Sequence, residues 1–262
     1  MSSKQSVLIT GASTGIGAVY ADRFAKRGHD LTLVARDHTR MKTLAERLRR
    51  DTGVSVHILP ADLTEPRDLA QVEARLRDDA RIGVLVNNAG ASAAGDFLHQ
   101  TTDEVTRIIN LNTTALARLA SAVAPRFAKA GDGAIINISS VVALAPEYGS
   151  TVYGATKAFV LFFSQGLHLE LAPKGIYVQA VLPAATRTEI WQRSGKDVDS
   201  LPAVMEVTEL VDAALVGFDR REPVTIPPLP NAEQWDAFEA ARRTMIPHFN
   251  QVEAAARYHV AA

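Results

Sequence analysis

The sequence predicts an α/β fold in which a parallel sheet carries helices on both of its faces. Up to residue 185, short apolar segments alternate with longer stretches that have the periodicity of helices. The apolar segments are rich in Val, Ile and Leu and lack polar alternation, which is typical of parallel strands buried on both faces. Repeated strand–helix–strand units imply right-handed crossovers and a doubly wound sheet. Six strands are expected, at residues 6–10, 30–35, 54–60, 83–87, 134–139 and 177–182.

Helices are expected between these strands. Two of them show clear helical spacing, with apolar residues every three or four positions on one face and charged residues around them. Each therefore has one face to bury against the sheet. The segment 38–50 places Met41, Leu44 and Leu48 together, and the segment 66–79 places Leu69, Val72 and Leu76 together.

The pattern becomes looser after residue 185. At about 150 residues per domain, a chain of 262 residues has one or two domains, and α/β domains often reach this length undivided. The loosely patterned part near the carboxyl ends of the strands is typical of a substrate lid, although a plain connector has the same pattern. We expect one domain, residues 1–262, with a core (5–185), a small lid (186–217), and a C-terminal part (218–262) that holds a last strand (223–226) and a helical extension (about 231–258).

Composition excludes several classes of protein. Lys plus Arg number 28 and Asp plus Glu 29, so the net charge of −1 gives no reason to expect nucleic acid or anionic lipid as a partner. There is no cysteine, which excludes disulfides and cysteine nucleophiles, and the seven histidines (His57, His99 and His168 among them) do not cluster with carboxylates, so no metal site is expected. No apolar stretch approaches the roughly 18 residues of a membrane span, and the first residues lack a secretory pattern. We expect a cytoplasmic protein that acts on a small molecule and has no membrane partner.

A glycine-rich turn separates the first strand from the first helix. It reads TGASTGIG at residues 10–17, so its glycines follow the pattern GxxxGxG rather than GxGxxG. A turn between strand and helix offers free backbone N–H groups and the positive helix end to a pyrophosphate, and glycine lets the phosphate approach the backbone. The turn therefore indicates a dinucleotide site, although three glycines alone also occur as packing devices.

Three further motifs follow in register. NNAG at residues 87–90 ends the fourth strand, Ser139-Ser140 ends the fifth, and YGATK at residues 153–157 opens the next helix. In order and spacing, these motifs and the glycine turn resemble those of the short-chain dehydrogenase/reductase family, over roughly residues 5–190. The resemblance implies a Rossmann domain that binds a nicotinamide dinucleotide, and an oxidoreductase that acts on CH–OH groups.

Tyr153 and Lys157 are the expected reacting pair. They are four residues apart on a helix and so share one face. An ammonium beside a phenol favours the phenolate and is expected to lower the pKa of Tyr153 from about 10 toward working pH, which suits a general acid/base. The resemblance implies that Tyr153 gives its proton to the substrate carbonyl oxygen during reduction. It also implies that Lys157 holds the ribose hydroxyls of the nicotinamide half.

Two further catalytic residues follow from the resemblance. Ser140 matches the serine that hydrogen-bonds the carbonyl oxygen; Ser139 is the adjacent alternative, but strand alternation lets only one of the two face the site. Asn112 matches the asparagine that binds a proton-relaying water, because Thr113-Thr114 follow it, whereas Asn110 aligns with a variable position.

NADP(H) is the expected cofactor. Sites that prefer NAD carry an acid at the end of the second strand, where this chain has Ala35 followed by Arg36. A guanidinium there suits the 2′-phosphate of NADP. NAD(H) stays possible, because Thr14 stands where many NADP-preferring relatives have a basic residue and because Asp37 could neutralise Arg36.

The remaining expected cofactor contacts lie at the ends of other strands. Asp62 and Leu63 resemble the pair beside the adenine, and Asn88 resembles the residue that steadies the central sheet. Thr188 is in register to contact the nicotinamide carboxamide, although Pro183-Ala184 replaces the usual Pro-Gly. The full set of expected contacts is Gly11, Ser13, Thr14, Gly15, Ile16, Gly17, Arg36, Asp62, Leu63, Asn88, Ala89, Gly90, Tyr153, Lys157, Pro183 and Thr188.

Other residues bear on substrate and assembly. Trp191 stands where lid residues of relatives contact substrate, and a place in the pocket and plain packing are equally open for it. Apolar residues of the helix that carries Tyr153 extend beyond one stripe, which indicates a deeply buried helix or an interface. Relatives dimerise through this helix and the preceding one, so a homodimer or homotetramer is expected. The apolar residues are Phe159, Phe162, Phe163 and Leu167.

The leading hypothesis is an NADP(H)-dependent oxidoreductase that interconverts the carbonyl and alcohol forms of a small molecule. The alternative is a reductase of 3-oxoacyl thioesters on an acyl carrier protein. That reading needs a basic docking patch, for which Arg126, Lys129 and Lys174 offer a thin one. A third hypothesis, a non-catalytic nucleotide-binding regulator, predicts erosion among the four catalytic residues, and none is visible.

Overall fold

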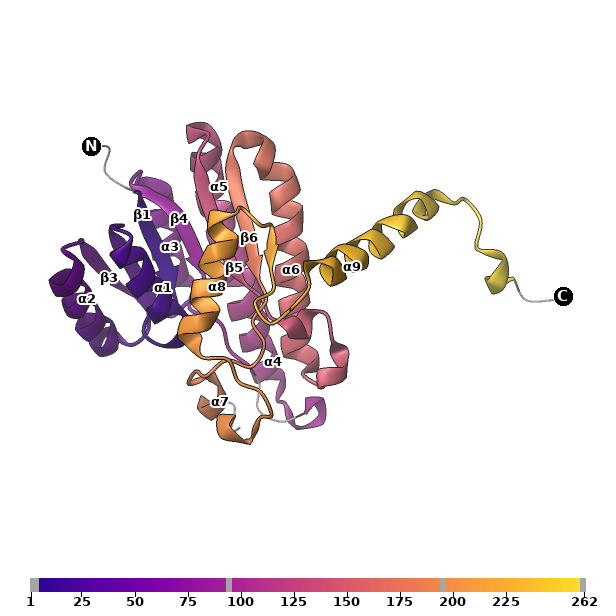
Figure 1. The fold of residues 1–262 in the computed structure, drawn as a ribbon, viewed down its shortest axis with the longest axis horizontal. Coiled ribbons are helices and arrows are strands. Elements are labelled where there is room, and N and C mark those ends of the chain that lie inside the picture. The colour runs from indigo at the N-terminus through magenta and orange to yellow at the C-terminus, as the bar shows by residue number, and fades with distance from the viewer. Residues whose placement is uncertain (1–4, 93–95, 194–196, 260–262) are drawn as a thin grey trace. The chain divides into compact units, whose positions relative to one another are not determined.

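A computed structural model describes residues 5–92, 96–193 and 197–259, and it confirms the predicted doubly wound parallel sheet (Figure 1). Seven parallel strands pair in the order β3-β2-β1-β4-β5-β6-β7. The strand order reverses between β1 and β4, and in such sheets ligands bind in the crevice outside the carboxyl ends of the strands at that point. The strands are β1 (Ser6–Thr10), β2 (Leu31–Ala35), β3 (Val56–Pro60), β4 (Ile82–Asn87), β5 (Gly133–Ile138), β6 (Ile176–Val181) and β7 (Val224–Thr225).

Helices cover both faces of the sheet (Figure 1). α1, α2 and α8 share one hydrophobic core with it, and α3, α5 and α6 share the other. Val7 and Ile9 of β1 belong to the first core and Leu8 to the second, and all three are fully buried. Burial on both faces explains why the strands need no polar alternation. The helices of this part are α1 (Gly15–Lys26), α2 (His38–Thr52), α3 (Pro66–Asp78), α4 (Thr102–Ile109), α5 (Leu116–Ala130), α6 (Thr151–Leu171), α7 (Ile190–Arg193) and α8 (Val207–Asp219).

The two helices predicted from their periodicity are present, as α2 and α3. Asp37 caps the start of α2, its carboxylate accepting a hydrogen bond from the Arg40 backbone N–H at 2.9 Å. Gly53 ends α2 at a φ of 76°, a conformation that glycine adopts without strain. α3 begins with Pro66, whose missing N–H costs nothing in the first turn of a helix.

The segment expected to form a lid is divided in the structure. Residues 207–219 form α8, and Leu210 and Val211 are buried in the core beside α1. Residues 207–217, expected in the lid, therefore belong to α8 and to the core, and a lid formed by the residues before them stays a prediction. The described part of the shorter segment contains α7, and Arg187 ties its two ends together by pairing with Asp199 at 2.6 Å and Glu206 at 2.9 Å.

Residues up to Pro227 form one compact unit, and residues from Pro228 form a second unit that is described by itself. The second unit contains α9 (Ala232–Met245), in which Trp235 and Phe238 stack with their ring centres 5.4 Å apart. The expected helix over 231–258 ends earlier than predicted, because Pro247 cannot continue it, and a short 3₁₀ turn, Ile246–Asn250, follows. Among the helices described, none has both the length and the apolar character needed to cross a bilayer.

Candidate functional site

The predicted site residues gather at the carboxyl ends of the central strands. The glycine turn follows β1, the NNAG motif follows β4, Ser140 follows β5 and Pro183 follows β6. Tyr153 and Lys157 lie in the first two turns of α6, which packs beside β6. The fold therefore brings five separate segments to the crevice where doubly wound sheets bind ligands.

The glycine turn is packed so closely that side chains cannot replace its glycines. Gly11 has a φ of 65°, and a Cβ there would lie 2.7 Å from Asn88 Nδ2. Gly15 has a φ of 53°, and its Cβ would lie 3.1 Å from the Thr188 methyl group. Within the described chain, no side chain caps the start of α1 at Thr14, so the first N–H groups of this helix are available to an anion. These features fit a dinucleotide pyrophosphate.

Thr10, which sequence reasoning did not single out, fastens the glycine turn to the NNAG motif. Its Oγ1 accepts hydrogen bonds from the backbone N–H groups of Asn88 (2.9 Å) and Ala89 (3.0 Å). The Asn88 side chain donates in return to the Thr10 carbonyl at 2.9 Å. The position of a threonine immediately before the first glycine was the signal available in the sequence.

Lys157 is buried below the phenol ring of Tyr153. It is 6% exposed, its Nζ lies 5.5 Å from the Tyr153 ring centre, and it donates a hydrogen bond to the Ile138 carbonyl at 2.8 Å. Burial lowers the pKa of Lys157 to about 8. A lysine so placed carries its charge at neutral pH but gives it up more easily than a solvated one.

The pKa of Tyr153 is raised, whereas the sequence led us to expect that Lys157 would lower it. Burial raises the pKa of the phenol to about 12, and a hydrogen bond with Ser140 only partly counters this. The physical reason is position: the ammonium faces the ring and the Ile138 carbonyl. In the protein alone, Tyr153 is therefore a protonated acid, which is the form needed to reduce a carbonyl.

The two candidate serines face opposite ways. Ser139 donates to the Lys157 carbonyl at 2.7 Å and is thus turned into α6. Ser140 lies on the other side, where its hydroxyl donates to the Pro183 carbonyl at 3.1 Å and affects the pKa of Tyr153. This alternation favours Ser140 as the substrate-facing residue.

Asn112 lies in a π-helical segment, Asn110–Ala115, between α4 and α5. It is 1% exposed, whereas Asn110 is exposed, which favours Asn112 as the site residue. Its side chain is hydrogen-bonded to Ala91 and Thr156, and its expected contact with a water stays a prediction. π-helical segments of this kind are frequent at functional sites.

Arg36 and Asp62 lie together at the adenosine end. Their side chains approach to 3.7 Å, and Arg36 is two-thirds exposed. Burial alone would raise the pKa of Asp62, but hydrogen bonds from Thr64 and the charge of Arg36 outweigh it and lower the pKa. Asp37, which was considered from the sequence as the residue that neutralises Arg36, caps α2 instead.

Two contacts of the lid segment were not foreseen. Glu189 accepts hydrogen bonds from Arg40 Nη1 at 2.7 Å, which links the start of α2 to the residue after Thr188. Trp191 is half-buried, and its indole N–H donates to the Thr186 carbonyl at 2.8 Å. Its expected contact with substrate stays a prediction.

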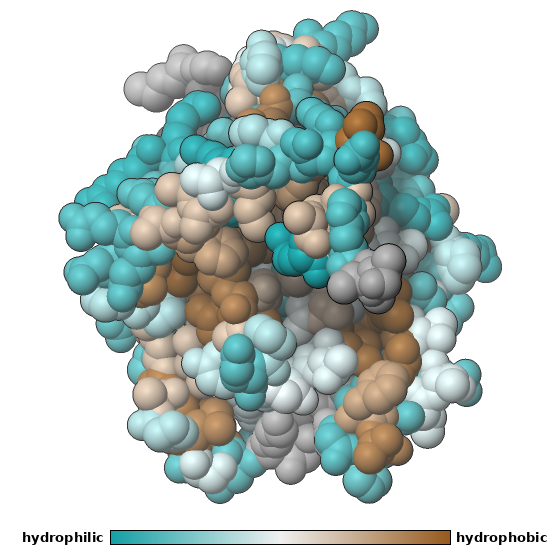
Figure 2. Space-filling model, turned by 90° about the vertical axis from the view of Figure 1, so that its right-hand side faces the viewer, coloured by the Kyte–Doolittle hydropathy of each residue, from teal (hydrophilic) through white to brown (hydrophobic). Residues whose placement is uncertain are grey.

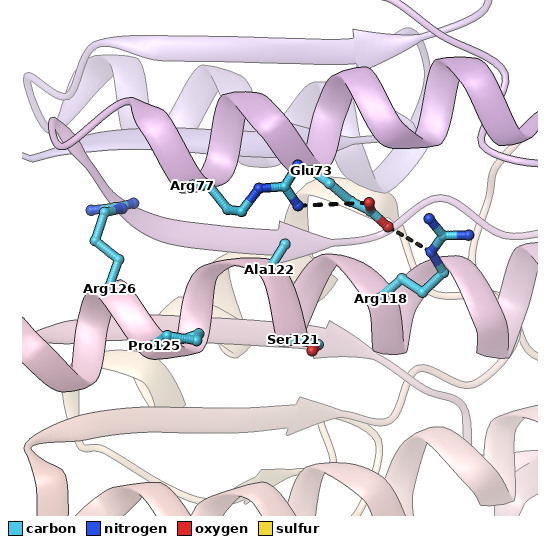
Figure 3. Close-up of a pocket in the computed structure, with 7 residues that line it drawn as sticks. All are labelled: Glu73, Arg77, Arg118, Ser121, Ala122, Pro125 and Arg126. Atoms are coloured by element: carbon cyan, nitrogen blue, oxygen red, sulfur yellow. Dashed lines mark hydrogen bonds and ion pairs between the residues drawn. The ribbon is translucent and has the colours of Figure 1, made fainter.

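A cavity of about 500 Å³ lies elsewhere, between α3 and α5 (Figure 3). Glu73 there lies between Arg118, at 2.6 Å, and Arg77, at 3.7 Å. Arg126, expected as part of a basic docking patch, instead donates to backbone carbonyls that include Leu76 and Ile82. Its guanidinium is therefore committed to joining these elements, which weakens the docking hypothesis. The lining residues are Glu73, Arg77, Arg118, Ser121, Ala122, Pro125 and Arg126.

Apolar side chains reach the surface in patches on one side of the molecule (Figure 2). On α6, Phe162 is 75% exposed and Leu169 is 76% exposed, while Phe159 stacks on Phe163 with ring centres 5.6 Å apart. Exposed aromatic residues on one helix face are a feature of interfaces.

Comparison with known proteins places these features among enzymes. Residues 5–199 match the family model described as short chain dehydrogenase. A curated relative, the very-long-chain 3-oxoacyl-CoA reductase of Anas platyrhynchos, is 34% identical over 73% of this chain. The match covers 63% of that relative, so this chain spans about three fifths of the length of such relatives.

Two solved structures are more similar. The short-chain dehydrogenase from Sphingobium yanoikuyae in complex with NADPH is 66% identical, with a TM-score of 0.96 over 97% of this chain and 100% of that one. The bulky-bulky ketone specific alcohol dehydrogenase from Comamonas testosteroni is 57% identical, with a TM-score of 0.92 over 98% of this chain and 99% of that one.

Proposed function

Because the chain belongs to the short-chain dehydrogenase family, we propose that it is an NADP(H)-dependent oxidoreductase that interconverts a ketone and a secondary alcohol. The observation that carries this proposal is the meeting of Tyr153, Lys157 and Ser140 beside a glycine turn with an uncapped helix start. The phenol is an acid, the lysine is a buried cation, and the serine is a donor that can hold a carbonyl oxygen.

The residues present fit a bound dinucleotide. Gly11, Gly15 and Gly17 form the cradle for the pyrophosphate, and Gly90 lets the ribose approach the backbone. Arg36 would hold the 2′-phosphate, since its guanidinium is exposed at the end of β2. When bound, the cofactor supplies the hydride for the carbonyl carbon.

The protein's own residues handle the proton. During reduction, the Tyr153 hydroxyl donates its proton to the substrate oxygen as negative charge develops there. The Ser140 hydroxyl turns from the Pro183 carbonyl to donate to the same oxygen. The Lys157 ammonium, 5.5 Å from the ring centre, is the positive charge available to the phenolate that Tyr153 leaves behind, although its present orientation toward the Ile138 carbonyl does not lower the pKa of the phenol. In the oxidation direction the phenolate takes the alcohol proton.

We propose a ketone with two large substituents as the substrate class, because the Comamonas enzyme named for such ketones is 57% identical over almost the whole chain. A 3-oxoacyl thioester is the second candidate, supported by the names of the curated relatives. Against it stands the commitment of Arg126 to backbone carbonyls.

Two further expectations belong to this proposal. We propose a homodimer or homotetramer built through α6, supported by its exposed Phe162 and Leu169. We also propose a cytoplasmic location, supported by the absence of cysteine.

The test is a substrate screen followed by absorbance of the reduced nicotinamide. NADPH is offered with ketones that carry two aryl groups, with methyl ketones, with aldehydes, and with a 3-oxoacyl-CoA. The proposal expects the highest kcat/KM with diaryl ketones. Preference for the 3-oxoacyl-CoA would favour the second candidate, and turnover of none would count against the oxidoreductase assignment.

Cofactor choice is tested by Arg36→Asp. This change should weaken the binding of NADPH by about tenfold or more and leave the binding of NADH nearly unchanged. The reason is that only NADPH carries the 2′-phosphate expected to contact the guanidinium. Equal weakening of both cofactors would remove Arg36 from the phosphate site.

A further inference from the structure

Thr156 joins two segments of the site through one buried hydroxyl. The hydroxyl donates to the Tyr153 carbonyl at 2.7 Å and accepts from Asn112 Nδ2 at 3.0 Å. Thr156 is 3% exposed and Asn112 1% exposed, so water has little access to this link. The link connects the catalytic turn of α6 to the π-helical segment.

Asn112 extends the link to a third segment. Its Oδ1 accepts from the Ala91 N–H at 2.9 Å, and its Nδ2 donates to the Ala91 carbonyl, also at 2.9 Å. Ala91 follows directly on the NNAG motif, so the cofactor-side loop is held in register with α6 through Asn112 and Thr156.

The same amide lies beside the reacting lysine. A Cβ built on Gly90 would lie 3.3 Å from Asn112 Oδ1 and 3.6 Å from Lys157 Nζ. The three groups therefore surround one small space. A shift of the Asn112 amide would change the packing and the solvation around the ammonium.

We propose that Thr156 is a positioning residue for the reaction. By fixing the Asn112 amide, it holds Tyr153 and Lys157 in a defined position relative to the loop at Ala91. This inference rests on the proposed function. It assigns to Thr156 an effect on chemistry that works through Asn112, Tyr153 and Lys157, without contact to substrate.

The same helix contains a matched control. Ser164, two turns further along α6, donates to the Val160 carbonyl at 2.6 Å and accepts from Asn137 Nδ2 at 2.9 Å. It is 1% exposed. Both hydroxyls thus donate to a carbonyl of the preceding turn and accept from a buried asparagine, but the hydrogen-bond partners of Ser164 do not include Asn112, Tyr153 or Lys157. Loss of the Ser164 hydroxyl should affect folding alone.

The experiment compares Thr156→Val, Thr156→Ser and Ser164→Ala in the full chain. Thr156→Val keeps the shape of the side chain and removes the hydroxyl. It should lower kcat about 10-fold to 100-fold, because small displacements of catalytic groups have effects of this size. Thr156→Ser should restore kcat to within about threefold of the wild type, and Ser164→Ala should stay within the same range.

Two readouts separate positioning from loss of structure. Binding of NADPH, followed by fluorescence, should change by less than about threefold in Thr156→Val, so that the effect falls on kcat. The alkaline limb of the kcat profile should move to higher pH in this variant, because a loosened amide admits water to Lys157 and relieves the burial that lowers its pKa.

Several outcomes overturn the proposal. Wild-type kcat and pH profile in Thr156→Val would do so, as would an equal loss of kcat in Ser164→Ala. If Thr156→Val does not fold, Thr156→Ala replaces it, and unchanged kcat in that variant has the same meaning. Tyr153→Phe is measured in parallel. If both Tyr153→Phe and Thr156→Val remain fully active, the proposed function fails as well. If Tyr153→Phe is inactive while Thr156→Val is unaffected, only the inference about Thr156 is refuted.

Discussion

Replacing Lys157 with methionine should stabilise the fold while it abolishes turnover. Lys157 is 6% exposed, and burial lowers its pKa from 10.5 to about 8. At about 1.4 kcal/mol per pKa unit, the buried charge costs the folded state about 3 kcal/mol at neutral pH. Methionine removes this cost but also removes the hydrogen bond to the Ile138 carbonyl, a loss of about 1–2 kcal/mol. We expect a net gain of about 1–2 kcal/mol in the free energy of unfolding.

The gain from Lys157→Met should depend on pH. The folded-state pKa of about 8 lies below the unfolded value of 10.5, so the unfolded chain binds more protons between these two values. The wild type therefore gains stability as pH rises through this window and loses it as pH falls through about 8. The advantage of the variant should be largest near pH 7 and should fall steadily toward pH 10.5.

Urea unfolding followed by circular dichroism, at several pH values between 7 and 10, measures this difference. Lys174→Met is the control, because Lys174 is exposed and its replacement should change stability by less than about 0.5 kcal/mol at any of these pH values. A difference between Lys157→Met and wild type that does not vary with pH, or a variant less stable at pH 7, would refute the reasoning.

Three further changes probe the scaffold of the site. Thr10→Val leaves two half-buried N–H groups without their acceptor and should lower the free energy of unfolding in urea by about 1–3 kcal/mol; no loss would show that the Thr10 link is dispensable. Gly11→Ala should weaken NADPH binding by about tenfold or more in a fluorescence titration, because its Cβ would meet Asn88 Nδ2, whereas Gly53→Ala, at a similar φ but in open space, should leave binding unchanged. Arg126→Gln loses hydrogen bonds to three backbone carbonyls and should cost about 1–3 kcal/mol in thermal unfolding with kcat unaltered; a fall in kcat would contradict its structural role.

The sheet was predictable because strands buried on both faces have an unmistakable composition. Val7, Leu8 and Ile9 belong to two different cores, and nothing polar interrupts them. By contrast, the early end of the last helix was missed, although Pro247 is a plain stop signal. Similarly, α8 was taken for part of a lid although its buried residues Leu210, Val211, Ala214 and Leu215 have helical spacing. The packing of this face beside α1 depends on the whole fold.

The site was predictable as a set of residues but not as a set of contacts. Tyr153 and Lys157 are neighbours on a helix by spacing alone, yet the direction of the tyrosine pKa depends on where the ammonium turns, toward the Ile138 carbonyl. The Arg40–Glu189 ion pair joins residues that are remote in the sequence, and no local sequence pattern predicts it. Contacts of this kind follow from tertiary packing, which spacing rules do not describe.

The central claim is that Tyr153 supplies the proton for carbonyl reduction, and Tyr153→Phe tests it most directly. The variant keeps the ring beneath which Lys157 lies and removes only the hydroxyl. With a diaryl ketone that the wild type reduces, the account predicts NADPH binding within about threefold of the wild type and kcat lower by at least about 10²-fold to 10⁴-fold. Undiminished kcat in a variant that binds NADPH normally would contradict it.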